Sequence, residues 1–107
     1  MRTMNYADWM KEGIRRFGPD QMDWRFVCPS CGHIANLQDW KDAGASSRQA
    51  AFSCVGRYLN DPVVSKNTFK NTGGPCDYAG GGLIGLNPVE IVMEGERNTR
   101  VFEFADA

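Results

Sequence analysis

Four cysteines constrain what this chain of 107 residues can fold into more than any other feature of its sequence. Cys28 and Cys31 form a Cys-x2-Cys pair, 22 residues separate Cys31 from Cys54, and 21 residues separate Cys54 from Cys76. Four thiolates close a tetrahedral structural zinc site, and a Cys-x2-Cys turn presents two of them from one tight loop. We therefore predict that Cys28, Cys31, Cys54 and Cys76 together bind one zinc ion.

The turn at residues 28–31 carries the stronger half of this prediction. Pro29 stiffens the turn, and Gly32 permits the left-handed backbone that often follows the second sulfur. Cys54 and Cys76 are single residues rather than a second Cys-x2-Cys pair, so their half of the pattern is weaker. The zinc prediction nevertheless uses every cysteine in the chain.

Other interpretations of the cysteines stay open at this point. A redox-active pair would begin a helix after a strand, whereas Gly32 follows the pair here and no helical pattern continues. The thiols could also be buried core residues without a metal. His33, the only histidine, could replace one sulfur as a ligand, or lie in a strand beside the site.

Catalytic motifs are missing from the sequence. A catalytic zinc needs an open coordination position and a nearby acid or base, and neither the His-x-Glu of zinc deaminases nor a His-Glu-x-x-His motif occurs. Asp77 could serve as a base, but a loop carboxylate is the simpler interpretation. Residues 80–82 are all glycine and lack the Gly-Lys-Ser/Thr of a phosphate loop, so they more simply allow close backbone approach. We expect a protein that is not an enzyme.

Residues 6–17 predict an amphipathic N-terminal helix. Asn5 is the expected N-cap, and Gly18 with Pro19 ends the helix. We expect the apolar face to pack on the core, and the alternative is a groove that accepts a partner. This face consists of Tyr6, Trp9, Met10, Gly13, Ile14 and Phe17.

The Cys-x2-Cys turn is expected to join two strands, at residues 24–27 and 33–35, in a zinc-knuckle hairpin. Residues 37–41 predict a short helix that Asn36 caps and Gly44 stops. A further helical turn is expected at residues 46–51, before a strand at Phe52. Residues 60–75 favour a loop.

Two alternating segments, residues 89–93 and 99–104, predict a C-terminal β-hairpin around a turn at 94–98. In the second segment Phe102 and Phe104 fall on one face. The predicted fold is therefore a single α+β domain over residues 1–107. It has an N-terminal helix, a zinc-knuckle hairpin and a C-terminal β-hairpin, and one zinc ion stabilises it.

The net charge of −1 argues against nucleic acid as the main partner. Zinc binding would change it to −3, because four thiols lose their protons and the metal returns two positive charges. Binding to a phosphate backbone normally needs a basic surface. A protein partner is therefore expected, with the basic and aromatic residues between positions 48 and 70 as the candidate surface. These are Arg48, Arg57, Tyr58, Lys66, Phe69 and Lys70.

The alternative function is a nucleic-acid-binding zinc ribbon. It would use the same four cations, with Tyr58 and Phe69 as groups on which bases stack. Arg57 has a third interpretation, because it follows Cys54 by three residues and could offset the negative charge of a four-thiolate zinc centre.

No secretory signal is visible near the start of the sequence, and no apolar run approaches the length of a membrane span. We expect a cytoplasmic protein that does not enter the membrane. Thiols stay reduced in that compartment, which favours metal binding over disulfides.

Three stretches of the sequence resemble a family of small uncharacterised proteins found in bacteriophage and prophage genomes. They are Cys-Pro-Ser-Cys-Gly-His-Ile-Ala at 28–35, Phe-Ser-Cys-Val-Gly-Arg-Tyr-Leu at 52–59 and the glycine-rich stretch around Cys76 at 74–88. The resemblance implies a phage setting in a bacterial host cell. Small phage proteins often act by binding a host protein, including components of antiviral defence such as CRISPR complexes, so the resemblance implies a binding protein of that kind.

Overall fold

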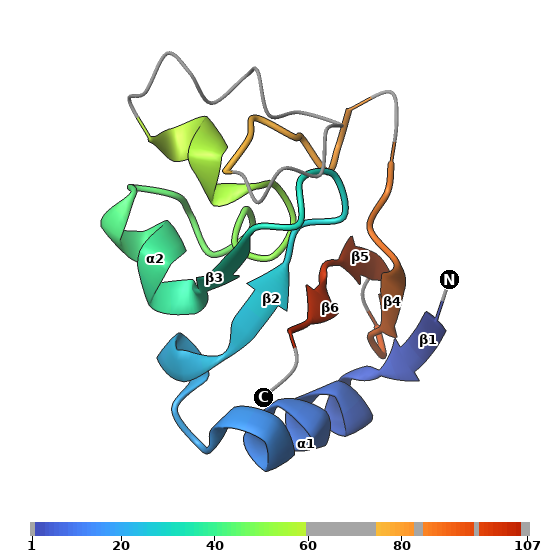
Figure 1. Cartoon of the computed structure of the whole chain (residues 1–107). Helices are drawn as coiled ribbons and strands as arrows, with labels where there is room; N and C mark the ends of the chain where they lie inside the picture. Colours follow the sequence, from blue (N-terminus) through green and yellow to red (C-terminus); the bar gives the residue numbers. More distant parts are fainter. Residues whose placement is uncertain (1, 60–74, 83–84, 96, 106–107) are drawn as a thin grey trace.

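The computed structural model describes residues 2–59, 75–82, 85–95 and 97–105. Within these residues the chain forms an α+β fold with two α-helices and two small sheets, as the sequence predicts. Figure 1 shows α1 along one end of the molecule, beneath the sheets. In chain order the elements are β1 (Arg2–Asn5), α1 (Tyr6–Phe17), the 3₁₀ helix η1 (Gln21–Asp23), β2 (Arg25–Val27), β3 (Ile34–Asn36), α2 (Leu37–Asp42), the 3₁₀ helix η2 (Val55–Tyr58), β4 (Val89–Val92), β5 (Thr99–Val101) and β6 (Glu103–Phe104).

Helix α1 begins and ends where the sequence predicts. The Asn5 side chain accepts a hydrogen bond of 2.8 Å from the backbone N–H of Asp8 at the N-terminus. At the other end Gly18 has a φ of +98°, and its N–H donates to the carbonyl of Ile14. A positive φ favours glycine, so this residue ends the helix without strain.

The apolar face of α1 is only partly covered by the core. Trp9 stacks on Phe26 and Phe104, with ring centroids 6.2 and 5.6 Å apart. In contrast, Tyr6 is 45% exposed and Ile14 is 47% exposed. The expected core packing therefore applies to Trp9, Met10 and Phe17, whereas Tyr6 and Ile14 present large side chains at the surface.

Strand β1 was not expected from the sequence. It pairs in parallel with β4, from Arg2 opposite Val89 to Asn5 opposite Val92, and β5 pairs antiparallel on the other side of β4. The predicted C-terminal hairpin of β4 and β5 is confirmed. Because β1 depends on pairing with residues almost ninety positions away, its short local sequence gives no sign of it.

The second sheet holds the predicted hairpin of β2 and β3, which pair antiparallel with Phe26 opposite Ala35. Its third strand is β6, where Phe104 lies opposite Phe26. The prediction of one continuous strand over residues 99–104 is wrong. The chain leaves the first sheet at Phe102, whose N–H donates to the carbonyl of Ala51 at 2.7 Å, and β6 then joins the other sheet.

Helix α2 is confirmed, with Asn36 and Asp39 forming a reciprocal capping box. The helical turn expected at 46–51 consists of hydrogen-bonded turns instead. The strand expected at Phe52 is wrong, because its N–H donates to the Gln49 carbonyl and its own carbonyl accepts from the Asn87 amide. Neither group is available for a sheet. Of the loop predicted at 60–75, residues 60–74 lie outside the described residues.

The largest fully buried side chains of the core are aromatic, and two buried indole N–H groups reach backbone carbonyls. Trp24 donates to Gly18 at 2.9 Å, and Trp40 donates to Ser53 at 2.8 Å. Each bond satisfies a polar group that would be costly to bury alone. The Trp40 bond also ties α2 to the segment that leads into Cys54.

We predict that Gly13→Ala destabilises the protein, although alanine normally favours a helix by about 1 kcal/mol over glycine. A Cβ at this buried position would lie 2.5 Å from the Trp24 ring, and Trp24 is fully buried. Such overpacking typically costs about 1–3 kcal/mol. Urea unfolding measures the change, and Lys11→Ala on the exposed face of the same helix is the control, expected within about 0.5 kcal/mol of the wild type. A Gly13→Ala variant as stable as the wild type would contradict the packing described here.

Candidate metal centre

The structure brings the four predicted ligands together. All four cysteines are buried with free thiols, and their Sγ atoms lie within 4.8 Å of one another. The Cys28 and Cys76 sulfurs are 4.0 Å apart, and those of Cys31 and Cys54 are 3.8 Å apart. A tetrahedral ion with metal–sulfur bonds of about 2.3 Å holds its sulfurs about 3.8 Å apart, whereas a disulfide needs about 2.0 Å. The cluster therefore suits one metal ion rather than disulfides.

The turn that carries the first two cysteines is closed by the backbone. Gly32 has a φ of +80°, and its N–H donates to the Cys28 carbonyl at 2.9 Å. The N–H of Cys28 donates in turn to the His33 carbonyl at 3.0 Å. Two further amides point at sulfur, from Ser30 to Cys28 at 3.4 Å and from His33 to Cys31 at 3.5 Å. Each N–H stabilises negative charge on the thiolate that a metal requires.

Cys54 and Cys76 are positioned against each other, although they are far apart in sequence. The Cys54 N–H donates to the Tyr78 carbonyl at 3.0 Å, and the Cys76 N–H donates to the Cys54 sulfur at 3.4 Å. The N–H of Tyr78 donates to the Cys76 sulfur at 3.4 Å. The guanidinium of Arg57 also donates to the Asp77 carbonyl at 2.9 Å. Hydrogen bonds between segments distant in sequence therefore position Cys54 and Cys76, whereas one tight turn positions Cys28 and Cys31.

Residues 52–54 connect this half of the cluster to the rest of the fold. The Ser53 carbonyl accepts a hydrogen bond from the Trp40 indole N–H, and the Ser53 hydroxyl accepts one from the N–H of Gly80 at 3.0 Å. The Phe52 carbonyl accepts the Asn87 amide at 3.1 Å. A Cβ on Gly80 would lie 2.1 Å from the Phe52 carbonyl oxygen, so glycine is required there. The close backbone approach expected of the glycine run occurs at this residue.

The thiols influence one another strongly before any cation is added. Hydrogen bonding with Cys54 and burial raise the pKa of the Cys28 thiol, and burial raises the pKa of Cys31 to about 12. The hydrogen bond from Cys28 lowers the pKa of Cys54 to about 5. Burial and repulsion between neighbouring sulfurs therefore oppose the build-up of negative charge on Cys28 and Cys31. Further thiolates require positive charge at the centre, which a metal ion supplies.

The other residues singled out in the sequence have different positions. His33 is half-buried, and its imidazole is not part of the ligand cluster found among the described residues. Arg48 is exposed between α2 and η2, and Arg57 is exposed on η2. Tyr58 is partly buried against the core. Three residues fall outside the described part of the chain, namely Lys66, Phe69 and Lys70.

Sequence reasoning missed two residues that position the ligand segments, Tyr78 and Asn87. Tyr78 bonds to both Cys54 and Cys76, and its hydroxyl accepts the N–H of Leu86 at 2.7 Å. Its place two residues after a ligand could have indicated this role. Asn87 is buried and donates to the Phe52 and Arg100 carbonyls, which no local pattern reveals.

The fold and the site define a small α+β domain whose distant segments meet at a four-cysteine cluster able to hold a metal ion. The chain belongs to the VVA0879-like family, whose model matches residues 5–105 and so includes α1 and all four cysteines. The family has no assigned activity. Comparison with curated proteins and with solved structures gave no match. No helix in the described ranges is long and apolar enough to cross a membrane.

We predict that Gly80→Ala disturbs the cluster, whereas Gly81→Ala does not. A Cβ at Gly80 meets the Phe52 backbone, but at Gly81 its nearest contact is the Phe52 ring at an ordinary 3.7 Å. Gly80→Ala should lower the free energy of unfolding by about 1–3 kcal/mol and speed the reaction of the cysteines with a thiol reagent. Gly81→Ala should stay within about 0.5 kcal/mol of the wild type. Equal behaviour of the two variants would argue against the role given to residues 52–54.

Proposed function

We propose that the cluster binds one structural zinc ion and that the folded domain acts by binding another protein, without catalysis. The observation that carries the zinc assignment is the set of four buried sulfurs within 4.8 Å of one another, two pairs of which lie at 3.8 and 4.0 Å, close to the separation expected around a tetrahedral ion. Thiolates in tetrahedral geometry suit zinc among the common divalent metals. Four thiolates also fill the coordination shell, which leaves no position for a reactive water.

Zinc would stabilise a fold whose core is modest for its size. It would join the hairpin of β2 and β3 to two segments that tertiary contacts alone bring together. Structural zinc can contribute about 10 kcal/mol to the folding of small zinc-finger peptides, and whole domains are stable by about 5–15 kcal/mol. Loss of the metal should therefore unfold much of the domain.

A protein is the better partner on electrostatic grounds. The net charge of −1 would become −3 with zinc bound, which opposes binding to phosphate. Several cations are also engaged within the fold. Arg2 and Arg16 pair with glutamates, at 2.8 and 2.6 Å. Arg57 and Arg100 donate to backbone carbonyls. The resemblance to phage proteins favours a bacterial host protein as the partner, with antiviral defence complexes as one class.

The zinc assignment predicts one zinc per chain in purified protein. Cys76→Ser should lose the metal and unfold or aggregate, because a three-sulfur site leaves the ion weakly held. Elemental analysis and circular dichroism measure the two effects, and Ser47→Ala, at an exposed position, is the control. Folded wild-type protein without metal would contradict the assignment, as would an iron content in place of zinc.

The partner assignment predicts a stoichiometric host protein when the tagged wild type is used to capture proteins from bacterial lysate, with and without phage infection. Titrations against duplex DNA, single-stranded DNA and RNA at physiological salt should show no sub-micromolar binding. Tight binding that falls steeply with salt and weakens in Arg48→Glu would instead support the nucleic-acid-binding alternative.

A further inference from the structure

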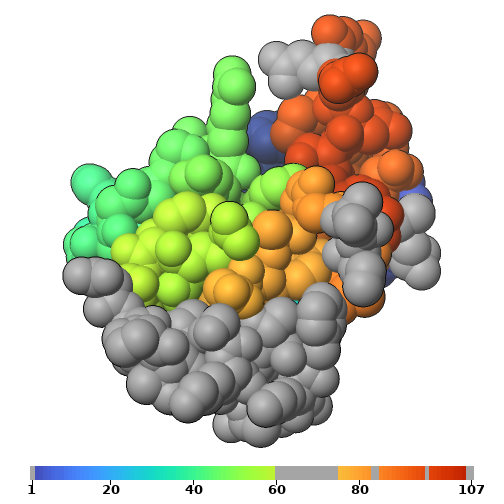
Figure 2. Space-filling view, turned by 90° about the horizontal axis from the view of Figure 1, so that it is seen from above, coloured from blue at the N-terminus to red at the C-terminus, as the bar shows by residue number. Residues whose placement is uncertain are grey.

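A groove of about 780 Å³ lies between two parts of the fold. Helix α2 and the segment that follows it form one wall, and the β4–β5 hairpin forms the other, with α1 contributing residues from its first two turns. Figure 2 shows a hollow between the green segment near residue 48 and the orange end of the β4–β5 hairpin. Clefts of this size that bind ligands are mostly apolar, with a few polar groups that fix orientation.

The groove has apolar side chains that the fold leaves uncovered. Tyr6 is 45% exposed and Met22 is 37% exposed, although both are large and line the groove. Trp9 also lines it, and the indole N–H of Trp9 is buried without a hydrogen-bond partner among the described residues. Buried donors nearly always have a partner in native structures, so this group calls for an acceptor.

The charged residues of the groove all have one sign. The described residues that line it include Lys41, Arg48 and Arg97, each exposed, and no carboxylate. The chain as a whole is nearly balanced, with 13 acidic and 12 basic residues. Charge complementarity therefore favours an anionic occupant.

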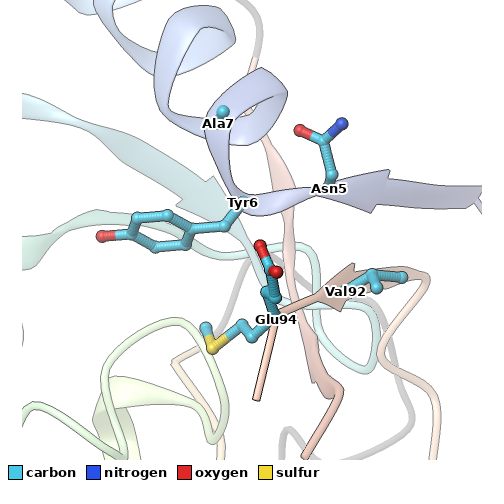
Figure 3. A pocket seen from close by; sticks show the side chains of 6 residues that line it. Asn5, Tyr6, Ala7, Val92 and Glu94 are labelled. Carbon is cyan, nitrogen blue, oxygen red and sulfur yellow. The ribbon is translucent and has the colours of Figure 1, made fainter. Parts of the chain in front are cut away.

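A second hollow of about 690 Å³ lies at the junction of β1 and α1. The two share Tyr6 and Met93. Figure 3 shows Tyr6 and Glu94 of this hollow, with the Glu94 carboxylate directed toward the start of α1. Val92 adds a further apolar side chain, 39% exposed. A ligand that occupies both hollows would be extended, and its part in the second hollow would lie beside the Glu94 carboxylate rather than beside cations.

We propose that the groove binds an extended peptide segment of a partner protein. An aromatic or long aliphatic side chain of the peptide lies beside Tyr6 and Trp9, and its acidic side chains face Arg48 and Arg97. Aromatic residues and arginine are enriched where protein interfaces gain most of their affinity. This proposal rests on the proposed function, because it assigns the surface through which the domain binds protein.

The test is selection of a random twelve-residue peptide library on zinc-loaded wild-type protein, followed by fluorescence titration of the enriched peptides. Enriched sequences should combine acidic with aromatic or long aliphatic residues. Arg48→Glu and Arg97→Glu should each weaken binding by about tenfold or more, as reversal of a complementary charge does. Lys11→Glu makes the same charge change on α1 outside the groove and should stay within about twofold. Circular dichroism confirms that the variants are folded.

Four results would overturn the proposal, the last of them from the capture experiment. The first is that no sequence is enriched, and the second is that enriched peptides bind Arg48→Glu and Arg97→Glu as tightly as the wild type. The third is a concentration-dependent dimer that Arg97→Glu dissociates, which would assign the groove to a second copy of the chain. If wild type and both arginine variants capture the same host protein equally, the groove assignment fails while protein binding stands. If the wild type captures no protein, the proposed function itself fails.

Discussion

The four-thiol cluster is the contact on which the rest of the structure depends. It joins three stretches of chain separated by more than twenty residues each, and two pairs of its sulfurs lie 3.8 and 4.0 Å apart. Without a cation nearby, burial makes it costly for these thiols to lose their protons, and the pKa values of Cys28 and Cys31 are accordingly raised. A cation at the centre removes that penalty and fixes the three stretches relative to one another.

Residues 50–54 connect this cluster to the groove. Ala50, Ala51 and Phe52 line the groove, and Cys54 of the four-thiol cluster lies two residues further on. The Ala51 carbonyl also accepts the N–H of Phe102, at the point where the chain passes from one sheet to the other. A metal ion that fixes Cys54 would therefore also fix one wall of the groove, and a preformed surface loses less entropy on binding. The metal would therefore affect partner binding by holding the groove in its binding shape.

The elements that the sequence predicts correctly are those specified by neighbouring residues. Helix α1 has a clear apolar period and an Asn5 cap, and the turn at 28–31 has its two cysteines and Gly32. The missed or wrong elements depend on distant partners. Strand β1 exists only through β4, and the break at Phe102 exists because β6 pairs with β2. That the four cysteines meet was predictable from residue type, and the place of Tyr78 beside Cys76 offered a hint of its role, whereas nothing local revealed the role of Asn87.

The most direct test of the metal-centred account is X-ray absorption at the zinc edge of the purified wild-type protein. The account predicts four sulfur neighbours at about 2.3 Å and no lighter ligand, because four buried thiolates complete the tetrahedron. A spectrum that requires a nitrogen or oxygen neighbour, or the absence of zinc from folded protein, would contradict it.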